Sequence, residues 1–251
     1  MHFCWLDTAP RPGWQNMAID RALADRAGRD HVVCYRIYRW DRHTISFGAN
    51  EAARKSWNRD ALARAGVQCV RRPTGGRGVW HDRGDLTYSV TAPAAALGGL
   101  RLAYRVIHEQ LAAALGGLGL AASLAAPGLR RPTLQPGACF DLAVGGEVLV
   151  GDRKVIGSAQ AALGPALLQH GAIACADRQP SLARFRLHDP VATVDPTPGE
   201  FPAADIVANT ILALWRRTGA EPAPPELVLA IEQDSATYGA HFRDQGWTWR
   251  R

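Results

Sequence analysis

Apolar and polar positions along the chain predict strands in the middle and helices toward both ends. Residues 34–40 and 86–90 alternate apolar and polar side chains, the period of a half-buried strand. Helical spacing predicts helices over 16–24, with Asn16 as N-cap, and over 60–66, 100–115, 203–217 and 225–236. Further strands are expected at 44–48, in a hairpin over 148–156 with residues 157–160 closing its second strand, and at 166–174. This pattern predicts an α/β class in the mixed-sheet sense.

No linker that must separate two domains is visible in the sequence. Residues 178–201 are a proline-rich connection between the predicted strands and the last two helices. We therefore expect a single domain over 1–251, with a core of about 1–177 and a helical C-terminal segment of about 200–251.

The densest cluster of unusual residues lies between Val70 and Val90 and is expected to be a strand, a glycine loop and a second strand. Gly75, Gly76 and Gly78 allow a sharp turn and a close approach to a ligand. Arg71 and Arg72 precede the loop, where guanidinium groups can hold a carboxylate, a phosphate or a phosphopantetheine group. The loop matches neither a Walker loop nor the dinucleotide fingerprint, and an ordinary turn in a basic hairpin remains the alternative.

Composition narrows the possible partners. The chain has 251 residues and a formal net charge of +6, which favours an acidic partner. No block of basic residues with interleaved aromatics is present, so a nucleic acid is not expected. No secretory signal and no apolar stretch suited to a membrane span is visible, so we expect a soluble, cytoplasmic protein without membrane contact. The five cysteines are scattered without a CxxC motif, which argues against a disulfide framework or a zinc site.

Two residues are the first candidates for covalent chemistry. Cys139 lies in a Pro/Gly-rich loop, and a thiol can carry an acyl group as a thioester that remains reactive to an amine. A nearby cation would favour the thiolate, and Lys154, one of two lysines among 29 basic residues, is close in sequence. A packed core cysteine is the alternative. His81, Asp82 and His170 are candidate bases or orienting groups, and their spacing does not indicate a metal site.

Six motifs together resemble the biotin/lipoate protein ligase superfamily, in particular its lipoate–protein ligases and octanoyltransferases. In chain order they are NMAID at 16–20, YRWDRHTISFG at 38–48, RRPTGGRGVWHDRGDLTYS at 71–89, ACF at 138–140, GDRKVIGSAQ at 151–160 and LQHGAI at 168–173. The resemblance implies a mixed-sheet catalytic domain in which the glycine loop and the lysine strand flank a tunnel for an eight-carbon acyl chain. By this similarity Cys139 and Lys154 are catalytic. The substrate-binding residues it implies are Arg72, Thr74, Gly75, Gly76, Arg77, Gly78, Val79, His81, Gly157, Ser158, Ala159, His170 and Gly171.

Within the superfamily, the position of Cys139 ahead of the lysine strand is similar to that in cysteine-dependent octanoyl-[acyl-carrier-protein]:protein N-octanoyltransferases. The resemblance implies that acyl carrier protein delivers the octanoyl group as a phosphopantetheine thioester. The acceptors would be lipoyl-accepting domains, such as the glycine cleavage H protein and the E2 subunit of 2-oxoacid dehydrogenases. Backbone N–H groups of the glycine loop or near Cys139 would stabilise the oxyanion. No metal and no other cofactor is expected.

Three alternatives stay open. An ATP-dependent lipoate ligase would use Lys154 and the glycine loop for an acyl-adenylate and leave Cys139 without a role. An octanoyl amidotransferase between lipoyl domains would use the same cysteine. A non-catalytic acyl-binding subunit would bind without turnover.

Overall fold

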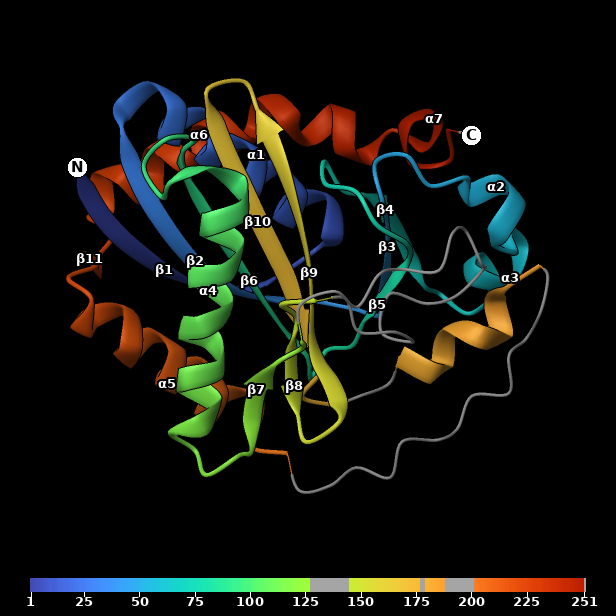
Figure 1. Ribbon diagram of the computed structural model, residues 1–251. Helices are drawn as coiled ribbons and strands as arrows, with labels where there is room; N and C mark the ends of the chain where they lie inside the picture. The colour runs from blue at the N-terminus through green and yellow to red at the C-terminus, as the bar shows by residue number, and fades with distance from the viewer. Residues whose placement is uncertain (127–144, 177–178, 188–200, 251) are drawn as a thin grey trace.

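The computed structural model describes residues 1–126, 145–176, 179–187 and 201–250, which form two β-sheets with helices packed around them (Figure 1). The larger sheet has eight strands in the order β11-β1-β2-β6-β10-β9-β8-β7. Strand β1 (His2–Arg11) is parallel to β2 (Val32–Trp40) and to β11 (Glu221–Pro222), and the remaining pairs are antiparallel. The sheet is therefore mixed, as the sequence pattern predicts.

The middle of this sheet carries the segments that the sequence singles out. Strand β10 (Ala166–Ile173) lies between β6 (Leu86–Pro93) and β9 (Arg153–Leu163), and β8 (Val148–Val150) and β7 (Ala122–Leu124) complete the edge. The hairpin between β8 and β9 turns at Gly151, whose φ is +59°. The register pairs His170 with Ser89 on one side and with Ala159 on the other.

Helices cover the large sheet on both faces. Helices α4 (Gly99–Gly116) and α5 (Ala204–Arg217) bury their apolar residues against Tyr35, Tyr88 and their neighbours on one face. Helices α1 (Gly13–Asp30) and α6 (Pro225–Arg243) lie together against the other face, with Ile19, Leu23 and Ile231 packed on β1 and β2. Burial of these apolar stripes is the main stabilising term of such a layered arrangement.

A second sheet of three strands lies beside the first (Figure 1). It consists of β4 (Gln68–Arg71), β3 (Thr44–Phe47) and β5 (Val79–His81), with β3 in the centre. Helices α2 (Ala53–Ser56) and α3 (Arg59–Arg64) and the 3₁₀ helix η1 (Gln179–Phe185) surround it, and the short α7 (Gln245–Thr248) contacts β4. Its core contains Phe47, Trp57, Trp80 and Trp249.

Three local predictions need correction. Asn16 is not an N-cap, because α1 begins at Gly13 and Asn16 is buried inside it, where its side chain accepts a hydrogen bond from Arg36 at 2.8 Å. Segment 70–90 contains parts of three strands where two were predicted, because residues 79–81 form the additional strand β5. The alternative of a single hairpin is wrong, because β4 and β5 each pair with β3 while β6 belongs to the large sheet. The last predicted helix extends beyond residue 236, since α6 continues to Arg243 and contains Tyr238 and Phe242.

Among the described residues, no helix is long and apolar enough to cross a membrane.

Candidate active site

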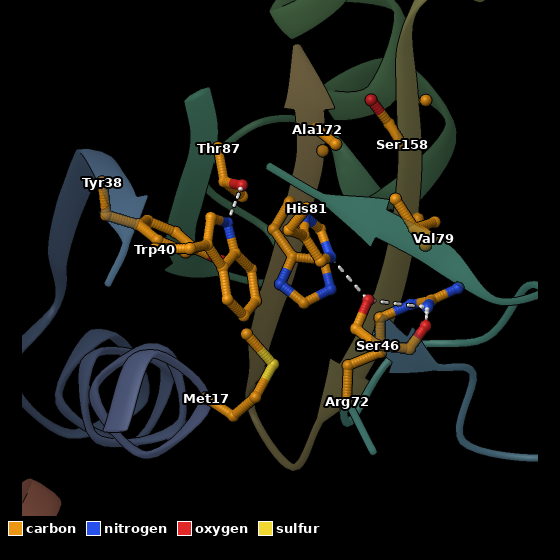
Figure 2. A pocket seen from close by; sticks show the side chains of 14 residues that line it. Met17, Tyr38, Trp40, Ser46, Arg72, Val79, His81, Thr87, Ser158 and Ala172 are labelled. Carbon is orange, nitrogen blue, oxygen red and sulfur yellow. Dashed lines mark hydrogen bonds between the residues drawn. The ribbon is translucent and has the colours of Figure 1, made fainter. Parts of the chain in front are cut away.

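A small cavity of about 20 Å³ lies between the two sheets beside α1 (Figure 2). Met17, Val79 and Ala172 give it apolar walls, while Ser46, Arg72 and His81 form a polar side. Eight of the residues predicted to bind substrate line it: Arg72, Val79, His81, Gly157, Ser158, Ala159, His170 and Gly171. Segments from β5, β9 and β10 are thus brought together at one cavity, the arrangement that the family resemblance implies.

The two arginines before the glycine loop bind the protein itself. Arg72 donates to the backbone carbonyl oxygens of Ser46 at 2.6 Å and of Gly75 and Arg77 at 2.8 Å, so its guanidinium holds the loop against β3. Arg71 is fully buried away from the cavity lining and donates to backbone carbonyl oxygens near the C-terminus, including Arg250 O at 2.7 Å. The prediction that Arg71 holds a ligand is therefore wrong, because its donors join β4 to the C-terminal segment.

The glycines of the loop have different functions. Gly76 has a φ of +96°, a left-handed conformation that favours glycine, and a Cβ there would approach Arg72. At Gly78 a Cβ would lie 2.5 Å from the indole of Trp57, so this glycine serves packing. A Cβ at Gly75 would meet no atom of the described residues within 4 Å. Among these three glycines, Gly75 is the one at which the described part of the chain leaves space for a ligand.

His81 occupies the centre of the polar side (Figure 2). Its Nε2 lies 2.8 Å from Ser46 Oγ, and its ring stacks on Trp40 with 3.9 Å between the ring centroids. Burial, together with the charge of Arg72 and with His170, lowers the pKa of His81 well below its usual value. The imidazole is therefore neutral at physiological pH.

His170 belongs to a buried polar network centred on Asp20 of α1. The Asp20 carboxylate accepts hydrogen bonds from Arg36 and Ser89 at 2.8 Å, from Tyr38 at 3.0 Å and from His170 Nδ1 at 3.1 Å. Burial acts to raise the pKa of Asp20, but Arg36 and the bonds from His170 and Ser89 outweigh it and lower the pKa.

The other ring nitrogen of His170 reaches the glycine loop. His170 Nε2 lies 2.6 Å from Thr74 Oγ1, and Thr74 is fully buried beneath the loop, outside the cavity lining. His170 thus joins α1 to the loop. Sequence reasoning assigned no role to Asp20, although its place in the NMAID motif was a usable signal.

A second polar chain lies on the α4 side of β9 and β10. Ser158 Oγ is 2.7 Å from Tyr88 OH and 2.8 Å from His108 Nε2, and His108 Nδ1 is 2.6 Å from Gly146 O. A carbonyl oxygen can only accept, so Nδ1 carries the proton and Nε2 accepts from Ser158. Burial lowers the pKa of His108 to about 4 despite the bond to Gly146, which keeps the ring neutral. Sequence reasoning missed His108, whose signal was a polar residue on the buried side of a predicted helix.

Lys154 lies next to this second chain. Its Nζ is 2.8 Å from Glu147 Oε1, and both side chains are buried, 3% and 2% exposed. Side chains at 154, 156 and 158 of a strand point to one face, so Lys154 faces α4 together with Ser158. Ser158 lines the cavity, whereas Lys154 is not part of the lining. Glu147 was missed, although an acidic residue directly before β8, in the hairpin that carries the lysine, could have indicated the pair.

Cys139 and the rest of the ACF motif lie outside the described residues. The structure therefore places Lys154 and the binding residues but not the predicted nucleophile. The backbone carbonyl oxygen of Arg77, another predicted binding residue, accepts a hydrogen bond from Arg72. In the described part of the chain, no group of three or more His, Cys, Asp or Glu side chains could hold a metal ion.

A family model and several curated proteins match this chain. Residues 12–190 match the family model described as the lipoyl protein ligase A/B catalytic domain. Octanoyltransferase LipM of Symbiobacterium thermophilum is 41% identical over 174 residues, covering 67% of this chain and 63% of the relative. Octanoyltransferase LipM of Kyrpidia tusciae is 40% identical over 166 residues, covering 63% of this chain and 60% of the relative. The matched region thus spans less than two thirds of the length of these relatives.

Solved structures match over nearly the whole chain. A lipoate-protein ligase A bound with ATP superposes with a TM-score of 0.76 at 20% identity, covering 99% of each chain. The bipartite lipoate protein ligase of Thermoplasma acidophilum, described with its E2 lipoyl domain, gives 0.73 at 21% identity and covers 99% of this chain and 96% of that one. At these identities the comparison establishes the fold.

Proposed function

The chain belongs to the lipoyl protein ligase A/B catalytic domain family, and from this premise we propose that it is an octanoyltransferase that modifies lipoyl-accepting domains. The observation that carries the proposal is the identity of 35–41% to several proteins named Octanoyltransferase LipM. The structural neighbours are lipoate ligases at 20–21% identity and bear on the fold, so the choice of a transferase over a ligase rests on the LipM relatives.

The reaction takes place in two acyl transfers through Cys139. The Cys139 thiolate attacks the thioester carbonyl of octanoyl-acyl carrier protein, and the phosphopantetheine thiol leaves, so one thioester replaces another. The ε-amine of a lysine on the acceptor domain then attacks the octanoyl-enzyme, forms an amide and releases the cysteine. Lys154 supplies the cation that favours the thiolate.

The cavity supports the proposal by its composition rather than by its present size. About 20 Å³ accommodates roughly one water molecule, far less than an octanoyl chain. Binding therefore requires the lining side chains to move. Met17 is suited to this, because an unbranched side chain with a flexible thioether can change rotamer at little cost.

The proposed donor and acceptor are both acidic proteins, which fits the net charge of +6. Because the partners carry charge of the opposite sign, electrostatic attraction raises the rate of encounter, and salt screens this attraction. Raising the ionic strength should therefore slow transfer through the association step.

A transfer assay tests the proposal. Purified protein, octanoyl-acyl carrier protein and a lipoyl-accepting domain are combined without ATP, and octanoylation of the acceptor is followed by mass. We expect modification by the wild type and none by Cys139→Ala, with Cys175→Ala as a matched control because Cys175 is a free cysteine of the described part. Modification that needs ATP and free octanoate, and that persists in Cys139→Ala, would identify a ligase instead.

A further inference from the structure

His81 carries a buried hydrogen-bonding atom that no described residue of the protein uses. The ring lines the cavity and is 4% exposed, and Nε2 is occupied by Ser46 Oγ. Nδ1 is buried and has no hydrogen-bond partner in the part of the chain that the structure describes. A buried polar atom left unsatisfied costs free energy, so such an atom in a ring that lines a binding cavity is a candidate to bind a ligand.

The neighbours of Ser46 determine which nitrogen of His81 holds the proton. Arg72 Nη1 donates to Ser46 Oγ at 3.2 Å, since a guanidinium can only donate. The hydroxyl hydrogen of Ser46 is then available for His81 Nε2, which accepts it, and the ring proton resides on Nδ1. The opposite tautomer would leave both the Ser46 hydrogen and Nδ1 unsatisfied. The unused atom is therefore a donor, an N–H group.

A ligand for this group must offer an oxygen acceptor within largely apolar surroundings. Met17, Val79 and Ala172 give the cavity beside the ring apolar walls, and the charge of Arg72 lies near enough to act on the His81 ring. A neutral carbonyl that becomes negatively charged during the reaction gains most from such a fixed donor.

We propose that the Nδ1–H of neutral His81 donates a hydrogen bond to the carbonyl oxygen of the bound octanoyl thioester and to the oxyanion that forms from it. This inference rests on the proposed function and adds a side-chain donor to any backbone donors. When the thiolate attacks, the carbonyl electron pair moves onto oxygen and is held by the Nδ1–H. When the oxyanion collapses, the carrier thiolate leaves, and His81 keeps its proton throughout. Burial suits this role, because a neutral imidazole is retained across physiological pH.

Two substitutions separate this role from a structural one. The amide of His81→Asn occupies the position of Nδ1 but cannot reach Ser46, while the amide of His81→Gln reaches the position of Nε2 and keeps the bond to Ser46. We expect His81→Gln to lower the rate constant of acyl-enzyme formation about 100-fold or more, with little change in KM, and His81→Asn to restore much of that loss. If His81 served to hold Ser46 and Arg72, the order of the two variants would be reversed, and this result would overturn the proposal.

Two measurements on bound and free protein keep the test independent of turnover. Octanoyl-pantetheine with a methylene in place of the thioester sulfur is an unreactive ketone, and its ¹³C-labelled carbonyl stretch reports a hydrogen bond. We expect a lower frequency in the wild type than in His81→Gln, and equal frequencies would refute the donor. Nitrogen-15 spectra of the wild type should show the His81 proton on Nδ1, and a proton on Nε2 would also refute it. Failure of the proposed function would appear differently, as a wild type that binds the ketone with a lowered carbonyl frequency but forms no acyl-enzyme.

Discussion

Lys154 and Glu147 form an ion pair inside the protein, where each charge depends on the other. Their charged atoms are 2.8 Å apart and both side chains are almost fully buried. Taking two charges out of water is costly, and removing one partner leaves the desolvation cost of the other. The pair therefore restrains the position of the ammonium that the proposed chemistry uses.

Glu147→Gln tests this dependence. We expect the free energy of unfolding to fall by about 3–5 kcal/mol, because the substitution removes the carboxylate that faces the buried ammonium. Urea titration followed by circular dichroism measures the change. The double variant Glu147→Leu/Lys154→Met should be more stable than Glu147→Gln, and a single-variant loss below about 1 kcal/mol would show that the pair is not important for stability.

His108 makes stability depend on pH. Its pKa is lowered from 6.5 to about 4 in the folded protein, and burial is the largest cause. Between these two pH values the unfolded chain therefore binds a proton that the folded chain does not. Stability from this group is present above pH 6.5 and is lost as pH falls toward 4, by up to about 3 kcal/mol. His108→Asn, which can still donate to Gly146 O without titrating, should lose less stability over this range. An equal loss of stability between pH 6.5 and pH 4 in His108→Asn and the wild type, measured by unfolding curves at each pH, would contradict the assignment to His108.

A functional residue could be predicted from the sequence when it lies in a short motif of unusual residues, and was harder to predict when its partners are distant in sequence. The glycine loop, His81 and His170 could be singled out because unusual residue types are clustered in short motifs. Asp20 and His108 had weaker local signals, since each acquires its function from partners far away in sequence, such as Ser89 at 2.8 Å from Asp20. Arg71 was misassigned for the same reason, because its partners are C-terminal carbonyl groups. Glu147 lies only seven residues before its partner Lys154, in the same hairpin, and its pairing could have been inferred from the sequence.

Strands β6, β9 and β10 approach closely where Gly171 faces Ser158. A Cβ at Gly171 would lie 2.6 Å from Tyr88 Cε1 and would also collide with Ser158 Oγ. The absence of a side chain therefore lets Ser158, Tyr88 and His108 form their hydrogen bonds beneath the cavity.

Gly171→Ala should disturb this packing. We expect a loss of about 1–3 kcal/mol in the free energy of unfolding, the range typical of overpacked cores. Gly116→Ala is the matched control, because its Cβ would meet no described atom within 4 Å and alanine favours the helix. Equal thermal melting temperatures for Gly171→Ala and the wild type would refute the packing argument.

Long elements with clear periodicity were predictable, while short ones were not. Helices α4 and α5 and strands β2 and β10 follow their predicted limits closely. An apolar stripe or alternation over many residues can be buried against the core in only one secondary structure. Strand β5 has three residues, and its pairing with β3 depends on tertiary contacts that no local pattern expresses. For this reason the pattern alone could not separate the two sheets.

Arg71 ties the C-terminal segment to the small sheet. Its guanidinium donates to the carbonyl oxygens of Thr248 at 3.0 Å and Arg250 at 2.7 Å and also to that of Glu51 at 2.9 Å. These bonds bring together parts of the chain separated by nearly 200 residues. A lysine could not satisfy all of these acceptors, because it lacks the planar fork of five donors.

Arg71→Lys is expected to destabilise the protein by about 3 kcal/mol and to expose the C-terminal segment to proteolysis. Arg64→Lys, at an exposed position of α3, serves as the control and should change stability little. Guanidinium unfolding and timed digestion with mass analysis measure both effects. A C-terminus that is as resistant in Arg71→Lys as in the wild type would show that other contacts hold it.

Acyl-enzyme formation on Cys139 is the step on which the proposed octanoyltransferase depends. Intact-mass spectrometry of the protein mixed with octanoyl-acyl carrier protein, without ATP, detects this step before any acceptor is added. We predict a single octanoyl adduct that hydroxylamine removes and that is absent from Cys139→Ala. The absence of an adduct, together with ATP-dependent modification of an acceptor domain by both proteins, would contradict a transferase and identify a ligase.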